Sequence, residues 1–538
     1  MLNRCLPTTL ANIIFFLQMR DELRVLSFKN NLDSLIAAII GASLVFIFTN
    51  YHGIGISPDS VSYAGVARNI RLGKGILEFN ENPLIIFPAG YPVFLGVLSW
   101  LFSSDVLVIA PFINAFLVGL ILFINGCIIQ RFSRIVYWYK WGILSILPIS
   151  YCLLDVFTML WSETLFLLWL SFFILSIRKY LKYPTIKALL LPALFTALAC
   201  DTRIAGLSIM GTGLLLIFLH KRVKWSLKLL HLVIYATGGI TLLLLNLVRN
   251  DRINGTMTGV RQKSVTPFWQ NLQYFGETVL QWFRISSANH ILCISLATIL
   301  LIGVSIILLY RYYKLDKIAS FETINIAFCI VYILFILLTS TISRYEKINN
   351  RLLSPAFIPL LLSISFFLPS LIKSIKIKFL KVLVIISMMF IFLALQFHQV
   401  MATIEFQQQT KDAGIPGYTE LDWQESDIVQ FLKTKPNYFK PDVEIYSNAC
   451  DAVYFYSGLP ALRIPEPVHK VDLKEYYETD GNYIVWFTND FNNPAIMPIS
   501  ELRKYRDIDT LTKFNDAIIF WSKPKVTITH NAQVIPKY

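Results

Sequence analysis

Apolar runs near the ~20 residues needed to cross a bilayer recur over the first 400 positions of the chain and predict membrane-spanning helices. The eleven predicted spans are 32–50, 106–130, 138–154, 157–177, 185–200, 204–219, 228–248, 290–310, 322–341, 352–372 and 378–398. Residues 1–31 carry a short apolar core followed by charges, which predicts an interfacial amphipathic helix on the cytoplasmic surface and no cleavable signal peptide. Residues 32–398 therefore form a polytopic α-helical membrane domain in this interpretation.

Basic residues gather in alternate connections between the predicted spans. They are Arg131, Arg134, Lys140, Arg178, Lys179, Lys182, Lys221, Arg222, Lys224, Arg311, Lys314, Lys373, Lys376 and Lys378. By the positive-inside rule this side is cytoplasmic, which predicts the N-terminus inside and the C-terminus outside a plasma (inner) membrane. The opposite side receives the loops 51–105, 249–289 and 342–351 and the turns at 155 and 201–203, which hold most of the unusual polar residues. We therefore expect the chemistry on the outer face.

The tail, 399–538, has a different pattern. Three segments, 442–448, 482–489 and 517–523, read as buried strands. Helical segments at 425–433, 451–457 and near 499–505 alternate with them. This alternation predicts a small α/β domain on the periplasmic, or extracytoplasmic, side.

Composition supports a membrane protein: 55% of the residues are hydrophobic, 15% are charged, and the mean hydropathy is +0.57. The net charge of +14 does not indicate a nucleic-acid partner, because from position 400 onward 14 Lys and Arg face 19 Asp and Glu. The excess therefore lies in the short loops of the membrane half, where it sets topology. The seven cysteines show neither metal-ligand spacing nor a paired framework.

The first outer loop, 51–105, carries a carboxylate close to the end of the first predicted span, Asp59. A carboxylate just beyond a membrane span is costly unless it faces water or has a function. A helix is predicted over 61–72, and Asp59 also suits the N-cap of a helix that starts at Ser60. The cap and a functional role are compatible.

Other ionisable residues cluster at predicted outer span ends. Asp155 lies in a tight turn, and Glu163 is expected about two turns inside its span, facing the interior with a partner. The bases are Arg68, Arg203, Arg249, Arg252, Arg261, Arg344, Lys347 and Arg351. Taken singly, each arginine is explained at least as well by snorkelling of its charged end to the membrane interface as by a function. Arg203 and Arg351 together stand out because positive charge is normally depleted at outer ends.

These residues fit transfer of a sugar from a lipid phosphate. A carboxylate such as Asp59 can take the proton of an attacking hydroxyl, and arginines can hold the phosphate as it departs. A metal site has weak support: a divalent ion on Asp59 or Asp155 stays open, while His52, His290 and His398 are isolated. No other cofactor is indicated.

An acid after the first span, a Tyr and helix, a Gly-x-Gly turn and a Pro/Tyr/Pro stretch resemble the first outer loop of the GT-C glycosyltransferases; here they are Asp59, Tyr63, 73–75 and 88–92. The segments WSETLFL (161–167), DTRIAG (201–206) and NNRLLSP (349–355) resemble the bacterial branch related to protein O-mannosyltransferases and to the aminoarabinose transferase of lipid A.

The sequence departs from both relatives of this branch. The paired Asp-Glu of mannosyltransferases is Asp59-Ser60 here. The acid-and-lysine pattern before the Pro-Pro of the aminoarabinose enzymes is absent. The first departure puts a protein acceptor in doubt, and the second means that lipid A is not implied as the acceptor.

The resemblance implies an inverting transferase that uses a polyprenyl-phosphate-linked sugar outside the cytoplasm, with a lipid, glycan or protein acceptor. It implies that Asp59 and Asp155 are catalytic acids and that Arg351 lies near the donor phosphate. We add Arg203, Arg344 and Lys347 as further candidates for binding the donor phosphate. Tyr63, Glu163 and Arg261 are supporting candidates. Two other interpretations stay open: a transporter or flippase of lipid-linked sugars, for which neither repeated halves nor broken helices are visible, and a non-catalytic envelope assembly subunit.

Overall fold

The computed structural model describes residues 31–131, 137–259, 261–286, 289–313, 317–344, 346–467, 470–488 and 496–525. The expected surface helix within 1–31 lies outside them, apart from residue 31. The chain divides into two compact units. The helical unit comprises 1–51, 85–91 and 109–411, and the mixed unit comprises 52–84, 92–108 and 412–538. The first outer loop is thus shared between the units.

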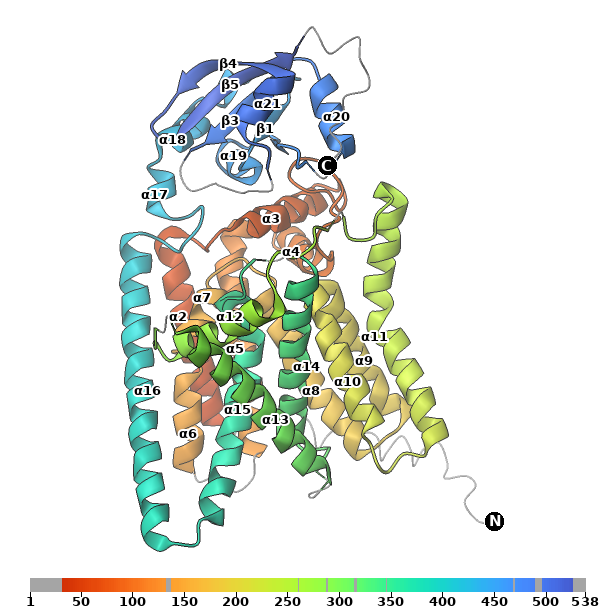
Figure 1. Ribbon diagram of the computed structural model, residues 1–538, viewed down its shortest axis with the longest axis vertical. Coiled ribbons are helices and arrows are strands. Elements are labelled where there is room, and N and C mark those ends of the chain that lie inside the picture. The colour runs from red at the N-terminus through yellow and green to blue at the C-terminus, as the bar shows by residue number, and fades with distance from the viewer. Residues whose placement is uncertain are drawn as a thin grey trace. The chain divides into compact units, whose positions relative to one another are not determined.

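The helical unit is built from long, mostly apolar helices (Figure 1). They are α2 (Leu32–His52), α5 (Val106–Arg131), α6 (Tyr137–Ile146), α7 (Tyr151–Phe157), α8 (Glu163–Lys182), α9 (Ile186–Thr202), α10 (Leu207–Phe218), α11 (Trp225–Asn254), α12 (Phe268–Trp282), α13 (His290–Tyr313), α14 (Phe321–Ile342), α15 (Asn350–Ser374) and α16 (Lys378–Asp412). In the described part of the chain, seven helices are long and apolar enough to cross a membrane, or eight if α6 and α7 form one bent span. The protein is a multi-pass membrane protein.

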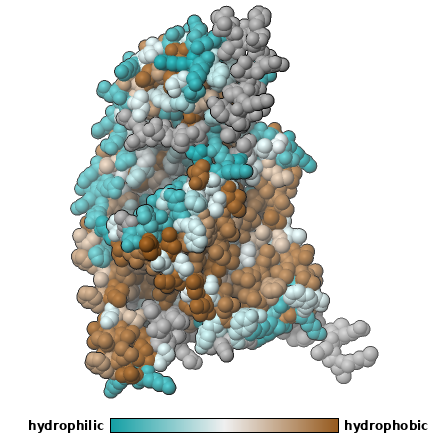
Figure 2. Space-filling view, in the orientation of Figure 1, coloured by the Kyte–Doolittle hydropathy of each residue, from teal (hydrophilic) through white to brown (hydrophobic). Residues whose placement is uncertain are grey.

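Apolar side chains also cover the outside of this unit (Figure 2). On α13, for example, Ile291, Ile299 and Ile306 are 77%, 67% and 59% exposed. In water such a surface would favour aggregation, whereas in a bilayer it is solvated by lipid chains. The exposed apolar residues therefore support membrane insertion of these helices.

Two details of the predicted spans are wrong. Helices α6 and α7 meet at a bend of 43°, so a broken helix exists where the pattern shows none, and Asp155 lies within α7 and not in a turn. Glu163 is the first residue of α8 and not two turns inside a span. Residues 158–162 connect the helices without helical geometry, which shifts the helix start from 157 to 163.

In the mixed unit, the first outer loop forms α3 (Pro58–Arg71), while α4 (Gly90–Leu101) continues from the helical unit. Ser57, not Asp59, caps α3: its hydroxyl accepts the backbone N–H of Ser60, and the Ser60 hydroxyl accepts the N–H of Ser57. Pro58 follows at the first helical position, where its missing N–H costs nothing. The interpretation of Asp59 as the N-cap is therefore wrong.

The tail folds into a five-stranded mixed sheet in the order β2-β1-β3-β5-β4. The strands are β1 (Ile445–Ser447), β2 (Leu462–Arg463), β3 (Asn482–Phe487), β4 (Arg506–Lys513) and β5 (Ala517–Pro524). Its helices are α17 (Leu421–Gln424), α18 (Asp427–Thr434), α19 (Cys450–Ser457), α20 (Lys470–Glu478) and α21 (Ile499–Tyr505). The three predicted strands and three predicted helices are confirmed within a few residues; β2, β4 and α20 were missed because they are short or polar.

The tail packs directly on the loop that carries Asp59. Helix α19 contacts α3, and the ring of Phe79 stacks on Tyr454 with centroids 5.0 Å apart. The backbone N–H of Tyr418 donates to the carbonyl of Ile56 at 2.8 Å. This approach requires Gly417, which has φ +118° and whose Cβ, if present, would lie 2.3 Å from the same carbonyl oxygen. The loop and the tail therefore fold as one unit.

Candidate functional site

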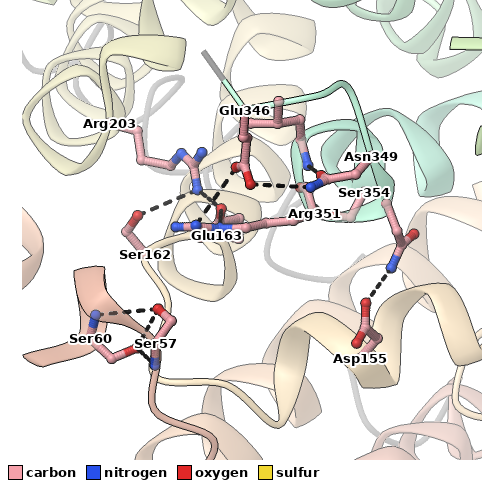
Figure 3. A network of polar contacts seen from close by, with 12 residues as sticks. Ser57, Ser60, Asp155, Ser162, Glu163, Arg203, Glu346, Asn349, Arg351 and Ser354 are labelled. Atoms are coloured by element: carbon pink, nitrogen blue, oxygen red, sulfur yellow. Dashed lines mark hydrogen bonds and ion pairs between the residues drawn. The ribbon is translucent and has the colours of Figure 1, made fainter. Parts of the chain in front are cut away.

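A buried charge cluster lies in the helical unit, formed by Glu163, Arg203 and Arg351 (Figure 3). The Nε atom of Arg351 donates to Glu163 Oε1 at 2.7 Å, and Arg203 forms an ion pair with the same oxygen. The Glu163 side chain is 0% exposed and each arginine side chain is 14% exposed. The expectation that Glu163 is buried and partnered is confirmed.

Each member of the cluster is held by local structure. Glu163 and Arg351 occupy the first turns of α8 and α15, and Arg203 follows α9. The chain can turn back sharply after Arg203 because Gly206 packs on α9, where a Cβ would lie 2.4 Å from the Cys200 nitrogen. The guanidinium of Arg351 also lies over the indole of Trp161, 4.3 Å from the ring centroid.

The buried members of the cluster carry two positive charges and one negative charge. Two guanidinium groups share one buried carboxylate, and Arg351 also pairs with Glu346, whose Oε1 lies 3.7 Å from Nη1 and whose side chain is 43% exposed. The second oxygen of Glu163, Oε2, is buried and has no hydrogen-bond partner among the described residues. The buried part of the cluster therefore carries a net charge of +1 and can accept an anion.

Asp155 is connected to the same helix start. The Asn350 amide donates to Asp155 Oδ2 at 2.8 Å and to the Cys152 carbonyl at 3.0 Å. The side-chain oxygen of Asn350, Oδ1, accepts a hydrogen bond from the indole N–H of Trp282 at 2.9 Å. Asn350 and Arg351 are consecutive, so α15 begins by holding Asp155 with one residue and Glu163 with the next. Sequence reasoning missed Asn350 and Trp282, although NNRLLSP had been singled out.

Three further candidates bond elsewhere in the helical unit. Arg344 bonds to Gln262, Lys347 pairs with Glu277 at 3.0 Å, and Arg261 donates to the Ile86 carbonyl at 3.2 Å. In the described chain these side chains make no recorded bond to Glu163, Arg203 or Arg351. They do not share the cluster.

In the mixed unit, Asp59 is the second residue of α3 and is half-buried, and Tyr63 follows one turn later with 4% exposure. Two carboxyl groups that the sequence analysis did not single out belong to the same surroundings. Burial raises the pKa of Glu78 to about 7, against the opposing influence of Arg463 and of a bond from Ser62. Ser62 lies on the α3 face that carries Asp59, three residues on.

The second of these groups is Asp451, at the start of α19. Burial raises its pKa, and the negative charge of Asp59 adds to the effect, while the Tyr418 hydroxyl donates to its Oδ2 at 2.5 Å. Its position directly after the predicted strand 442–448 was the available signal. Asp59 therefore lies in an acidic environment made by the loop and the tail together.

No grouping of three or more His, Cys, Asp or Glu residues capable of holding a metal ion occurs in the part of the chain that the structure describes. The acids Asp59 and Asp155 belong to different units.

The fold is that of the GT-C membrane glycosyltransferases, which confirms the resemblance at the level of the fold. It is similar to the crystal structure of ArnT from Cupriavidus metallidurans bound to undecaprenyl phosphate, with a TM-score of 0.53 and 10% identity, over 90% of this chain and 97% of ArnT. The apo form of ArnT gives a TM-score of 0.52 at the same identity and coverage. The archaeal oligosaccharyltransferase AglB from Archaeoglobus fulgidus matches with a TM-score of 0.48 and 11% identity over 95% of this chain and 75% of AglB.

No family model matches the sequence, and no curated protein does.

Proposed function

We propose that this protein is a glycosyltransferase that moves a sugar from a polyprenyl-phosphate-linked donor to a hydroxyl of a lipid, glycan or protein acceptor, with inversion. The observation that carries the proposal is the buried cluster of Glu163, Arg203 and Arg351 with its net charge of +1. It lies in a fold similar to that of ArnT, whose crystal structure contains undecaprenyl phosphate.

The phosphate of such a donor is a phosphodiester with a single negative charge, which matches the net charge of the cluster. Arginine forks bind phosphate oxygens with two parallel hydrogen bonds, and these bonds strengthen as the leaving phosphate gains charge. Glu163 keeps the two guanidinium groups together in the absence of the donor. The polyprenyl chain lies against the apolar outer surface of the helices.

Asp59 is the proposed base. The acceptor hydroxyl attacks the anomeric carbon and gives its proton to the Asp59 carboxylate, and the bond between that carbon and the phosphate oxygen breaks with its electron pair on the phosphate. One displacement inverts the anomeric centre. Since Ser57 already caps α3, the Asp59 carboxylate is not required for the helix start. Asp155 orients or stabilises the reacting groups in this proposal.

The finer topology also belongs to the proposal. We infer eleven spans with the N-terminus in the cytoplasm, and the shorter helices α9, α10 and α15 cross the membrane together with the seven long ones and the bent pair α6–α7. The distribution of Lys and Arg in alternate loops supports this orientation. The loop that carries Asp59 and the tail 412–538 would then face the outside of the inner membrane.

The test is transfer of radiolabel from a panel of polyprenyl-phosphate sugars into a membrane extract, with Asp59→Asn beside the wild type. We expect incorporation from one donor and its loss in the variant. Glu81→Gln is the matched control, because Glu81 is an exposed acid of the same loop that pairs with the exposed Lys74, and it should keep activity. Full activity of Asp59→Asn would refute its role as base. No incorporation from any donor, with folded protein, would favour a transporter, to be followed as movement of lipid-linked sugar across vesicles.

A further inference from the structure

An open cavity of about 590 Å³ lies in the helical unit, and its lining includes none of Glu163, Arg203 and Arg351. It is formed by the start of α7, the end of α12 with the turn after it, and the last turns of α16. Its volume falls in the range typical of small-molecule sites. None of its lining residues was singled out by the sequence.

The lining combines an aromatic wall with hydrogen-bonding groups. Tyr151 and Phe406 meet edge to face, with ring centroids 5.4 Å apart. Gln281 and Gln409 contribute amide groups whose side chains bond to no other described residue, and each can donate and accept. Aromatic rings pack against the C–H faces of sugar rings, and amides bond to their hydroxyls, so this combination suits a carbohydrate.

The charged groups at the cavity are paired with each other or with near neighbours. Arg284 forms an ion pair with Glu405, and Glu277 pairs with Lys347 at 3.0 Å. Each charged residue of the lining therefore has an ion-pair partner, so the cavity offers no unpaired charge to a ligand. Arg284 is held at φ +56°, a left-handed conformation that costs a non-glycine residue free energy and persists where surrounding contacts impose it.

The cavity is coupled to Asp155 by short connections. Tyr151 lies one helical turn before Asp155 on α7. Gln281 precedes Trp282, whose indole N–H bonds to Asn350, and Asn350 bonds to Asp155. A ligand in the cavity would thus contact Tyr151, one helical turn from one of the two candidate catalytic acids.

We propose that this cavity binds an uncharged sugar ring of the substrate, held by Gln281 and Gln409 against Tyr151 and Phe406. The inference rests on the proposed function for its biological meaning. The ring belongs either to a glycan acceptor or to the donor, and both sources present the same chemistry to the cavity.

The direct test is saturation-transfer NMR on the full-length protein in lipid nanodiscs. The probes are the methyl glycosides of glucose, mannose, galactose and N-acetylglucosamine, with the corresponding sugar 1-phosphates as charged comparators. We expect contact with at least one methyl glycoside, weakened about tenfold in Gln281→Ala and in Gln409→Ala, since each loses about one net hydrogen bond. Gln270→Ala is the control, because Gln270 is an exposed amide on α12 outside the cavity.

Absence of contact with every glycoside, or contact unchanged in both cavity variants, would overturn the inference. This arm does not depend on transfer, so it stays decisive if no donor is active. If transfer is found, its kinetics identify the source. An acceptor KM raised about tenfold by Gln281→Ala, with the donor KM unchanged, assigns the ring to the acceptor, and the reverse assigns it to the donor. If neither the donor KM nor the acceptor KM changes, the result counts against sugar binding in the cavity.

Discussion

Replacing Glu163 by Gln tests whether the cluster is an ion network. The substitution keeps the shape of the side chain and removes its charge, which leaves Arg203 and Arg351 close together and 14% exposed without their shared carboxylate. Removing one partner of a buried ion pair costs about 3–5 kcal/mol because the remaining charge is buried and uncompensated. Two guanidinium groups lose their partner here, so we expect a loss in the upper half of that range.

The measurement is the free energy of unfolding in mixtures of sodium dodecyl sulfate and mild detergent. Glu501→Gln is the control, since Glu501 pairs with Lys504 at 2.7 Å on an exposed surface and should change stability by less than about 1 kcal/mol. The double variant Glu163→Gln/Arg203→Gln restores the net charge of +1 and should recover part of the loss. A single variant within about 1 kcal/mol of the wild type, or additive effects in the double variant, would refute the network.

Four further predictions concern Asp59, Arg351, Glu78 and Gly417. Asp59→Asn abolishes transfer without changing the circular dichroism of the folded protein, because Ser57 caps α3. Arg351→Ala raises the donor KM about tenfold to a hundredfold, because charge-assisted hydrogen bonds to the donor phosphate are lost, and it changes the acceptor KM little. Steady-state kinetics measures both constants. Because burial raises the pKa of Glu78 from 4.5 to about 7, the wild type loses stability as the pH rises through that interval, by at most about 3 kcal/mol; Glu78→Gln removes this slope in thermal unfolding between pH 5 and 7. Gly417→Ala lowers the melting temperature and increases proteolysis of the tail, since its Cβ collides with the Ile56 carbonyl, and an unchanged melting temperature would contradict the proposed close approach.

The broken helix at α6 and α7 shows where pattern reading failed. Its two halves have an apolar sequence that reads as a single span, and they meet at 43° across residues 147–150, where Pro148 lacks the backbone N–H that would continue the helix. Hydropathy measures the average free energy of transfer of the side chains from water, and it carries no information on bends within an apolar run. Asp155 was therefore placed in a turn, whereas α7 carries it and Asn350 holds it.

The prediction of the N-cap of α3 was wrong for a different reason. Asp and Ser are both good N-cap residues, and propensity alone does not choose between Ser57 and Asp59. The structure chose Ser57 because Pro58 fixes the first helical position and Ser60 completes the reciprocal bonds. The reciprocal capping bonds of α3 therefore come from Ser57 and Ser60.

The sequence by itself determined the membrane class, the positions of the helices, the α/β nature of the tail and the identity of the charged candidates, because these depend on hydropathy and periodicity along the chain. Only the tertiary structure decided that Glu163 joins Arg203 to Arg351, that Asn350 holds Asp155, and that the tail packs on α3. These residues lie between 40 and 390 positions apart, and a one-dimensional pattern does not record which helix ends meet. Side-chain contacts between distant segments arise from packing, and that is where the candidate chemistry of this protein is assembled.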